Sequence, residues 1–276
     1  MTTNERSDAG DGATMRGLSD ILRSRCSVRA FLDRDVADDQ VRGLLSVASR
    51  APSSRNVQPW RVYVVRRPTM LALDRAIATD GNNRPGGAQE CVEPYDSRRA
   101  QWERQLFSLL KLDPRDSDVR RQLSARERLF FGAPVGLLVT ADERLSDDER
   151  FGVGMFVQTF LLAAENAGLG TCVHAAYAGH EDVLREMVGL GEHDRFVCGI
   201  ALGHADAAAS ENWLTSSRAD QDEWVRFVPD AHGRVMATPS RSVPATPERE
   251  GRRGGRLRRP EWLTLPPRGG LDPVAG

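Results

Sequence analysis

The chain has 276 residues, of which 40% are apolar and 28% charged, with 38 basic and 39 acidic side chains. This length suffices for a large domain with a buried core, and a net charge of −1 gives no reason to expect nucleic acid as the main partner. The first twenty residues hold no apolar block, and no apolar run approaches the roughly 20 residues of a membrane span, so neither a secretory signal nor a membrane partner is expected. Four cysteines lie far apart without a CxxC pair, which argues against a disulfide framework or a zinc ribbon and favours a cytoplasmic protein.

Composition divides the chain into three parts. The segment 229–276 carries nine arginines against five acidic residues, with eight prolines and few large apolar residues. Such a composition buries too little surface to offset the entropy lost on ordering. We therefore predict mobile ends at 1–15 and 229–276 and a folded domain over 16–228. The basic cluster within 252–259 is interpreted as a solvated tail, with an RNA or an acidic partner as the alternative.

The first half of the domain alternates between helical and extended patterns. Apolar spacing predicts a short helix around 18–22 and a second helix that follows Asp38 and presents Val41, Leu44 and Ala48 on its inner face. The remaining predicted elements are a β-branched strand at 60–65, charged helices at 95–112 and 117–131, and a strand at 134–140.

A long apolar helix dominates the second half. Between Phe151 and Ala164 only Gln158 and Thr159 are polar, so the helix predicted over 151–167 belongs in a core or a subunit interface. Gly168 follows this helix and is expected to terminate it, because glycine readily adopts the left-handed backbone conformation found after helix ends. A strand near 171, a helix at 181–188 and a strand at 195–202 follow. The pattern predicts an α+β fold in which helices surround a central mixed or antiparallel sheet of about five strands.

A basic segment follows the first helix. Arg25 and Arg29 bracket Ser27, with Cys26 between them. Two guanidinium groups and a hydroxyl suit a phosphate, which binds bidentate, permanently charged donors. The alternative is a solvated helix end.

The loop before the first strand is rich in short polar side chains. Pro52 and Pro59 restrict its backbone, and its donors and acceptors suit the edge of a planar heterocycle; these polar residues are Ser53, Ser54, Asn56 and Gln58. The alternative is an ordinary turn, since serine, asparagine and proline are common in turns.

The third polar segment is GLGTC at 168–172, with Asn212, Arg218 and the pair Asp222 and Glu223 further along the chain. Gly170 allows backbone to approach a ligand closely. A helix terminus alone also explains the glycines. The spacing of the histidines and cysteines does not match that of a metal site. The serines and glycines do not form the motif of a hydrolase or of a nucleotide-binding loop. Cys172 and Cys198 are expected to pack as small apolar side chains.

Taken in order, these segments resemble the FMN-dependent nitroreductase family. The resemblance rests on RCSVRAF at 25–31, APSSRNVQPW at 51–60, FGAPVGL at 131–137, GMFVQ at 154–158, GLGT at 168–171, CGIALG at 198–203, and Asn212 with Arg218, Asp222 and Glu223. It covers about 18–228, and the pieces at 131–137 and 154–156 are most similar to the branch that reduces nitrobenzoate-like compounds.

The resemblance implies a homodimer with two FMN molecules between its subunits. It implies that the phosphate and ribityl end is held by Arg25, Cys26, Ser27, Arg29 and Arg218. It implies that the loop at 52–58 meets the flavin from the other subunit or at the ring edge, through Pro52, Ser53, Ser54, Asn56 and Gln58. It implies that backbone of Leu169, Gly170 and Thr171 lies near the ring. NAD(P)H would pass hydride through flavin N5 to a small aromatic acceptor, with no obligatory catalytic acid or base in the protein.

Two alternatives to a nitroreductase remain on this scaffold. One is a flavin-dependent dehydrogenase or tailoring enzyme, and the other is a flavin-binding dimer without enzymatic activity. Many relatives have arginine where this chain has Cys26. Four aromatic side chains in the 95–130 region are candidates either for stacking on an acceptor or for the core: Tyr95, Trp102, Phe107 and Phe130.

Overall fold

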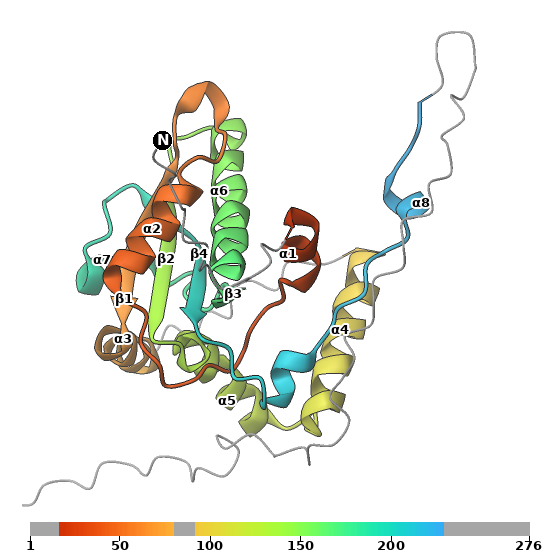
Figure 1. Ribbon diagram of the computed structural model, residues 1–276. Helices are drawn as coiled ribbons and strands as arrows, with labels where there is room; N and C mark the ends of the chain where they lie inside the picture. Colours follow the sequence, from red (N-terminus) through yellow and green to blue (C-terminus); the bar gives the residue numbers. More distant parts are fainter. Residues whose placement is uncertain (1–16, 80–91, 229–276) are drawn as a thin grey trace, which may run out of the picture.

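The computed structural model describes residues 17–79 and 92–228. These residues form helices around a single antiparallel sheet (Figure 1). The mobile ends predicted at 1–15 and 229–276 lie outside the described residues.

Four strands make up the sheet in the described part of the chain, in the order β1-β2-β4-β3. Their bounds are β1 Trp60–Arg66, β2 Val135–Asp142, β3 Gly170–His174 and β4 Asp194–Gly203. All neighbours are antiparallel, and one register shift separates Val139 from Thr140 in the pairing of β2 with β4. The prediction of an α+β fold with helices around a central sheet is confirmed, and the described residues contain four strands where about five were predicted. The extended segment at 25–31 forms two isolated bridges, Ser27 to Thr171 and Phe31 to Ala205. Each bridge joins a single pair of residues, so this segment does not form a further strand of the sheet.

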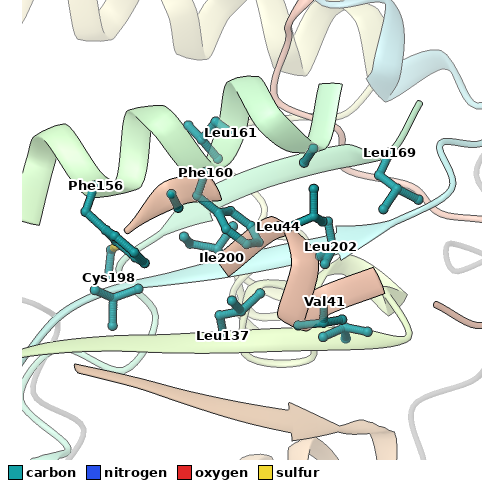
Figure 2. Close-up of a cluster of buried hydrophobic side chains, with 14 of the residues drawn as sticks. Val41, Leu44, Leu137, Phe156, Phe160, Leu161, Leu169, Cys198, Ile200 and Leu202 are labelled. Carbon is teal, nitrogen blue, oxygen red and sulfur yellow. The ribbon is translucent and has the colours of Figure 1, made fainter. Parts of the chain in front are cut away.

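One face of the sheet is covered by α2 (Asp38–Ala48) and α6 (Asp147–Asn166). Side chains at alternate positions of β2 and β4 point to this face and pack against both helices, as expected for period-two strands. Figure 2 shows Phe156 and Phe160 of α6 above Leu137 and Ile200, with Leu44 of α2 beside them. This layer is the larger of the two described core clusters.

The opposite face is covered by α3 (Arg67–Thr79) and α7 (Glu181–Val188). Helix α3 was missing from the sequence prediction. Its signal was present, since Met70, Leu73 and Ile77 are spaced three and four residues apart and all pack into this face. Phe130 is fully buried here, and its ring occupies the space that a side chain at Gly136 would need.

Helix α6 begins earlier than the predicted Phe151. Ser146 and Glu149 form a capping box, and Gly168 has the left-handed conformation (φ 74°) predicted for the residue after the helix. Only one side of the helix is buried. Phe151 is 70% exposed, so the nearly all-round apolar pattern leaves apolar surface facing outward.

The other helices stand to one side of the sheet and α6. These are α1 (Leu18–Ser24), α4 (Tyr95–Leu110), α5 (Ser117–Arg128) and α8 (Gln221–Trp224), with short 3₁₀ turns η1 (Ser54–Asn56), η2 (Phe130–Gly132) and η3 (Ser210–Trp213). In Figure 1 the chain after β4 follows α4 and then forms α8. An ion pair between Arg98 and Glu223, 2.8 Å long, links α4 to α8.

Candidate functional site

The basic segment after α1 lies against the start of β3. Ser27 forms a parallel bridge with Thr171, and the Val28 N–H donates to the Thr171 carbonyl at 2.8 Å. The first and third polar segments of the sequence are thus neighbours in space. This arrangement puts Arg25, Ser27 and Arg29 at the edge of the sheet, close to the C-terminal end of α6.

Gly170 allows this close approach. A Cβ on Gly170 would lie 2.7 Å from Cγ2 of Val28, which is closer than real Cβ contacts. The space beside the glycine is therefore filled by Val28. In the described structure its role is to dock the basic segment.

Arg25 and Arg29 have different surroundings. Arg25 is half-buried, and its guanidinium has no hydrogen-bond or ion-pair partner among residues 17–79 and 92–228. Arg29 donates to the Ser27 carbonyl at 3.1 Å and lies over the Trp102 ring, 5.2 Å from its centroid. Arg25 is thus a cation free to bind an anion, whereas Arg29 connects the basic segment to α4.

Asn212 holds the basic segment from the other side. Its Oδ1 accepts from the N–H groups of Arg29 (2.6 Å) and Ala30 (3.1 Å), while its Nδ2 donates to the carbonyls of Ala30 (2.8 Å) and Asp206 (2.9 Å). All four hydrogen-bonding positions of the amide are occupied. Asn212 therefore positions the segment and has no capacity left for a ligand.

The polar loop at 52–58 is exposed and tightly turned. Arg55, Asn56 and Gln58 have positive φ values of 48°, 60° and 48°. The Ser53 hydroxyl accepts from the Gln58 N–H at 3.0 Å, and Gln58 Nε2 donates to the Asn56 carbonyl at 3.2 Å. Pro52, Ser54 and Asn56 have exposed side chains, so the loop presents its polar groups to the outside.

Within one chain this loop and the basic segment do not meet. Ser53 packs against Gly152 near the start of α6, whereas Ser24 of α1 donates to Glu165 at the end of α6. Gly152 and Asn166 are separated by about 21 Å along the helix axis, at a rise of 1.5 Å per residue. Figure 1 shows the loop before β1 at one end of α6 and α1 toward the other.

Arg218 lies apart from both groups in its described contacts. It is exposed, and its Nη1 donates to the Ser216 carbonyl (3.1 Å), the Ser216 hydroxyl (2.9 Å) and the Ser217 carbonyl (3.0 Å). None of these contacts brings it to Arg25 or Arg29. Glu223, also singled out in the sequence, pairs with Arg98.

The strand cysteines pack as predicted. Burial raises the pKa of the Cys172 thiol to about 11 and that of Cys198 to about 11, so both stay protonated at neutral pH. Cys26 is half-buried, and all three described cysteines are free.

Of the four aromatic candidates, Trp102 and Phe107 line a cavity between α4 and α5. Phe130 is a core residue, and Tyr95 is 59% exposed.

The cavity also contains polar residues that sequence reasoning missed. Arg126 pairs with buried Glu211 at 2.9 Å, and burial lowers the pKa of the arginine against the opposing effect of Glu211. Desolvation raises the pKa of Glu127, opposed by the charges of Arg29 and Arg128. No local signal distinguished Arg126 and Glu127, because the predicted helix at 117–131 is charged throughout, and Glu211 lies in a short turn without a recognisable motif.

The part of the chain that the structure describes has no helix that is both long and apolar enough to cross a bilayer.

Known proteins of similar sequence and structure identify the family to which this chain is related. The chain is 34% identical over 219 residues to a nitrobenzene nitroreductase from Ectopseudomonas oleovorans, covering 76% of this chain and 96% of that protein. It is 30% identical to a 4-nitrobenzoate reductase from Pseudomonas putida, covering 75% and 94% of the two chains. The crystal structure of an FMN and NADPH-dependent nitroreductase, NfnB from Sphigopyxis sp. strain HMH, superimposes with a TM-score of 0.73 at 29% identity, covering 77% and 99% of the two chains. The model of the nitroreductase family matches residues 22–204, and the chain belongs to this family.

Proposed function

We propose that this protein is an FMN-dependent oxidoreductase that transfers hydride from NAD(P)H to a nitroaromatic or similar small acceptor. The observation that carries the proposal is the docking of Arg25, Ser27 and Arg29 beside Thr171 in a chain of the nitroreductase family. The similar proteins are named as nitrobenzene and nitrobenzoate reductases, and the similar structure as FMN- and NADPH-dependent.

The residues at the sheet edge fit the phosphate end of FMN. A half-buried cation without a protein partner is costly unless an anion joins it, and Arg25 is such a cation. Ser27 adds a hydroxyl and Arg29 a second guanidinium, while the Cys26 backbone passes between them. Residues 169–171 provide backbone beside the same place. Arg218 is assigned to the phosphate by the family motif, and joining it requires its exposed segment to move.

The polar loop supports a site shared between two chains. Pro52, Ser53, Ser54, Asn56 and Gln58 lie at the opposite end of α6 from Arg25 within one chain. Two chains packed with their α6 helices antiparallel bring the loop of one to the basic segment of the other. The outward apolar side of α6, with Phe151 exposed, is the surface that such a homodimer buries. We therefore propose a homodimer with two composite sites.

When bound, FMN supplies the redox chemistry, since its ring system accepts hydride from a nicotinamide and returns it to an acceptor. The chain's own residues bind and orient. Arg25 and Ser27 fix the phosphate end, and the permanent charge of Arg29 stabilises negative charge on a group bound beside it. The protein has no need of a catalytic dyad for this role, so we assign binding residues alone. Free cysteines and the lack of CxxC pairs are consistent with a place in the reducing cytoplasm.

The test is an absorbance spectrum of the purified protein, before and after anaerobic addition of NADPH. Yellow protein that bleaches with NADPH and recovers its colour when nitrobenzene is added is the expected result. A colourless protein that cannot be reconstituted with FMN overturns the proposal. Protein that bleaches but is not reoxidised by any nitroaromatic compound keeps the flavin and removes the acceptor class.

A further inference from the structure

Both polar groups of the Arg29 backbone are held by side chains from other parts of the chain. Its N–H donates to Oδ1 of Asn212 at 2.6 Å, and its carbonyl accepts from Nη2 of Arg126 at 2.8 Å. The same nitrogen of Arg126 donates to Oε1 of Glu211 at 2.9 Å. Since Glu211 and Asn212 are neighbours in η3, this short turn fixes the N–H of Arg29 directly and its carbonyl through Arg126.

The ion pair in this arrangement lies in the interior of the chain. The side chain of Arg126 is 17% exposed and that of Glu211 is 3% exposed. Burying two charges costs free energy that their attraction repays only with good geometry, and apolar residues of similar volume are often as stable. The pair is therefore weak evidence for stability, whereas its geometry joins α5, η3 and the backbone of Arg29 at one guanidinium nitrogen.

The basic segment is thereby fastened on both sides of its predicted phosphate ligands. On one side the Val28 N–H donates to the Thr171 carbonyl at 2.8 Å. On the other side the Arg29 carbonyl is held by Arg126, and the Arg29 side chain donates to the Ser27 carbonyl at 3.1 Å. A segment whose backbone is already fixed loses little conformational entropy when a ligand binds to it, which raises its affinity.

We propose that Arg126 is a positioning residue for the cofactor. Paired with Glu211, it holds the carbonyl of Arg29 so that the Arg29 guanidinium is presented to the phosphate of FMN. The inference rests on the proposed function, because that function assigns the phosphate to Arg29. Arg126 acts through Arg29 and has no assigned contact with the cofactor.

Riboflavin separates positioning at the phosphate from general damage, because it has the ring and ribityl chain of FMN without the phosphate. The dissociation constants of both flavins are measured by fluorescence quenching on the full-length, flavin-free protein, in wild type and in Arg126→Leu. We expect Arg126→Leu to weaken FMN binding about tenfold or more and riboflavin binding less than about twofold. Equal weakening of the two flavins, or none, overturns the proposal.

A double-mutant cycle with Arg29→Ala gives a second, independent readout. Arg29→Ala keeps the carbonyl that Arg126 holds but removes the guanidinium that this contact positions. We therefore expect Arg126→Leu to weaken FMN binding less than about twofold in the Arg29→Ala background, against about tenfold in wild type. Additive losses overturn the proposal.

A paired substitution keeps the test decisive if Arg126→Leu does not fold, since that variant leaves the Glu211 carboxylate buried without its partner. In Arg126→Leu/Glu211→Leu both charges are absent, and we expect its urea midpoint to stay near that of wild type while FMN binding weakens about tenfold. Normal FMN binding in this folded variant overturns the proposal.

Arg128→Leu is the matched control on the same helix. Arg128 is 21% exposed, and its Nε pairs with Asp74 of α3 at 2.7 Å. We expect Arg128→Leu to bind FMN as wild type does, and a loss equal to that of Arg126→Leu overturns the proposal. Wild-type protein that binds no FMN contradicts the proposed function itself, whereas FMN binding that is the same in wild type and the Arg126 variants contradicts the positioning role alone.

Discussion

The N–H of Val28 donates to the carbonyl of Thr171 at 2.8 Å, which fastens the basic segment to the edge strand of the sheet. The side chain of Val28 fills the space above Gly170, where a Cβ would come within 2.7 Å of it. The positions of Ser27 and Arg29 therefore depend on a residue at 170 without a side chain.

Gly170→Ala is expected to lower the free energy of unfolding by about 1–3 kcal/mol, the usual cost of overpacking, and to weaken FMN binding. Urea denaturation and an FMN titration measure the two effects. Gly43→Ala is the control, because it lies on an exposed face of α2 with nothing within 4 Å of an added Cβ, and we expect it to be stabilising by about 0.5–1 kcal/mol. Adding Val28→Ala to Gly170→Ala should recover part of the loss; equal losses in the single and double variants contradict the packing argument.

Asn212→Asp is expected to destabilise the protein by about 2–4 kcal/mol, since two donated hydrogen bonds are lost and a carboxylate then faces the carbonyls of Ala30 and Asp206. The measurement is again urea denaturation. Asn56→Asp serves as the matched control, because that side chain is exposed. If both variants lose the same stability, Asn212 does not have the positioning role assigned to it.

Arg25→Ala is expected to weaken FMN binding about 10- to 100-fold, because a charge-assisted hydrogen bond is worth about 1.5–3 kcal/mol. Arg23→Ala, in the exposed last turn of α1, is the control and should bind FMN normally. Arg218→Ala is also expected to weaken binding. Quenching of FMN fluorescence gives the affinities, and an unaltered affinity in Arg218→Ala removes that residue from the site.

Mixed dimers test whether each site is shared between chains. Arg25→Ala and Gln58→Ala homodimers each carry two damaged sites if the site is composite. Refolding them together creates mixed dimers with one undamaged site and one doubly damaged site. We expect the differently tagged, purified mixed dimer to recover tight binding of one FMN for every two chains. No recovery indicates that both residues act within a single chain. Normal FMN binding by the Gln58→Ala homodimer itself indicates that Gln58 does not contact the cofactor.

Because His174 is buried, we expect the folded protein to lose stability on acidification. It is 7% exposed, and burial among Phe130, Phe131 and Tyr177 lowers its pKa to about 4. Since the unfolded state binds the proton near pH 6.5, stability should be complete above that pH and fall toward pH 4, by an amount on the order of 3 kcal/mol. Denaturation midpoints at pH 7.5 and 5 measure the slope. His174→Leu should flatten it, and an equal slope in the variant assigns the effect to other groups.

Most of the secondary structure was predictable because the chain follows regular patterns. Helix α7 begins and ends at the predicted residues, and β1 has the expected β-branched alternation. Helix α3 was missed although its apolar spacing is regular. The start of α6 was missed because its capping residues, Ser146 and Glu149, precede the apolar run on which the prediction depended.

The sequence by itself determined the family, most of the helices and strands and the identity of the candidate FMN ligands, because these depend on local pattern and on residue type at fixed spacing. Only the tertiary structure decided which of those residues meet. It joined Ser27 to Thr171, assigned Asn212 to the backbone of Arg29, and separated the loop at 52–58 from Arg25 by most of the length of α6. It also paired Arg126 with Glu211 and left one oxygen of that glutamate without a donor. Such relationships join residues far apart in the chain, and no local pattern encodes a contact that exists only after the sheet and its helices have packed.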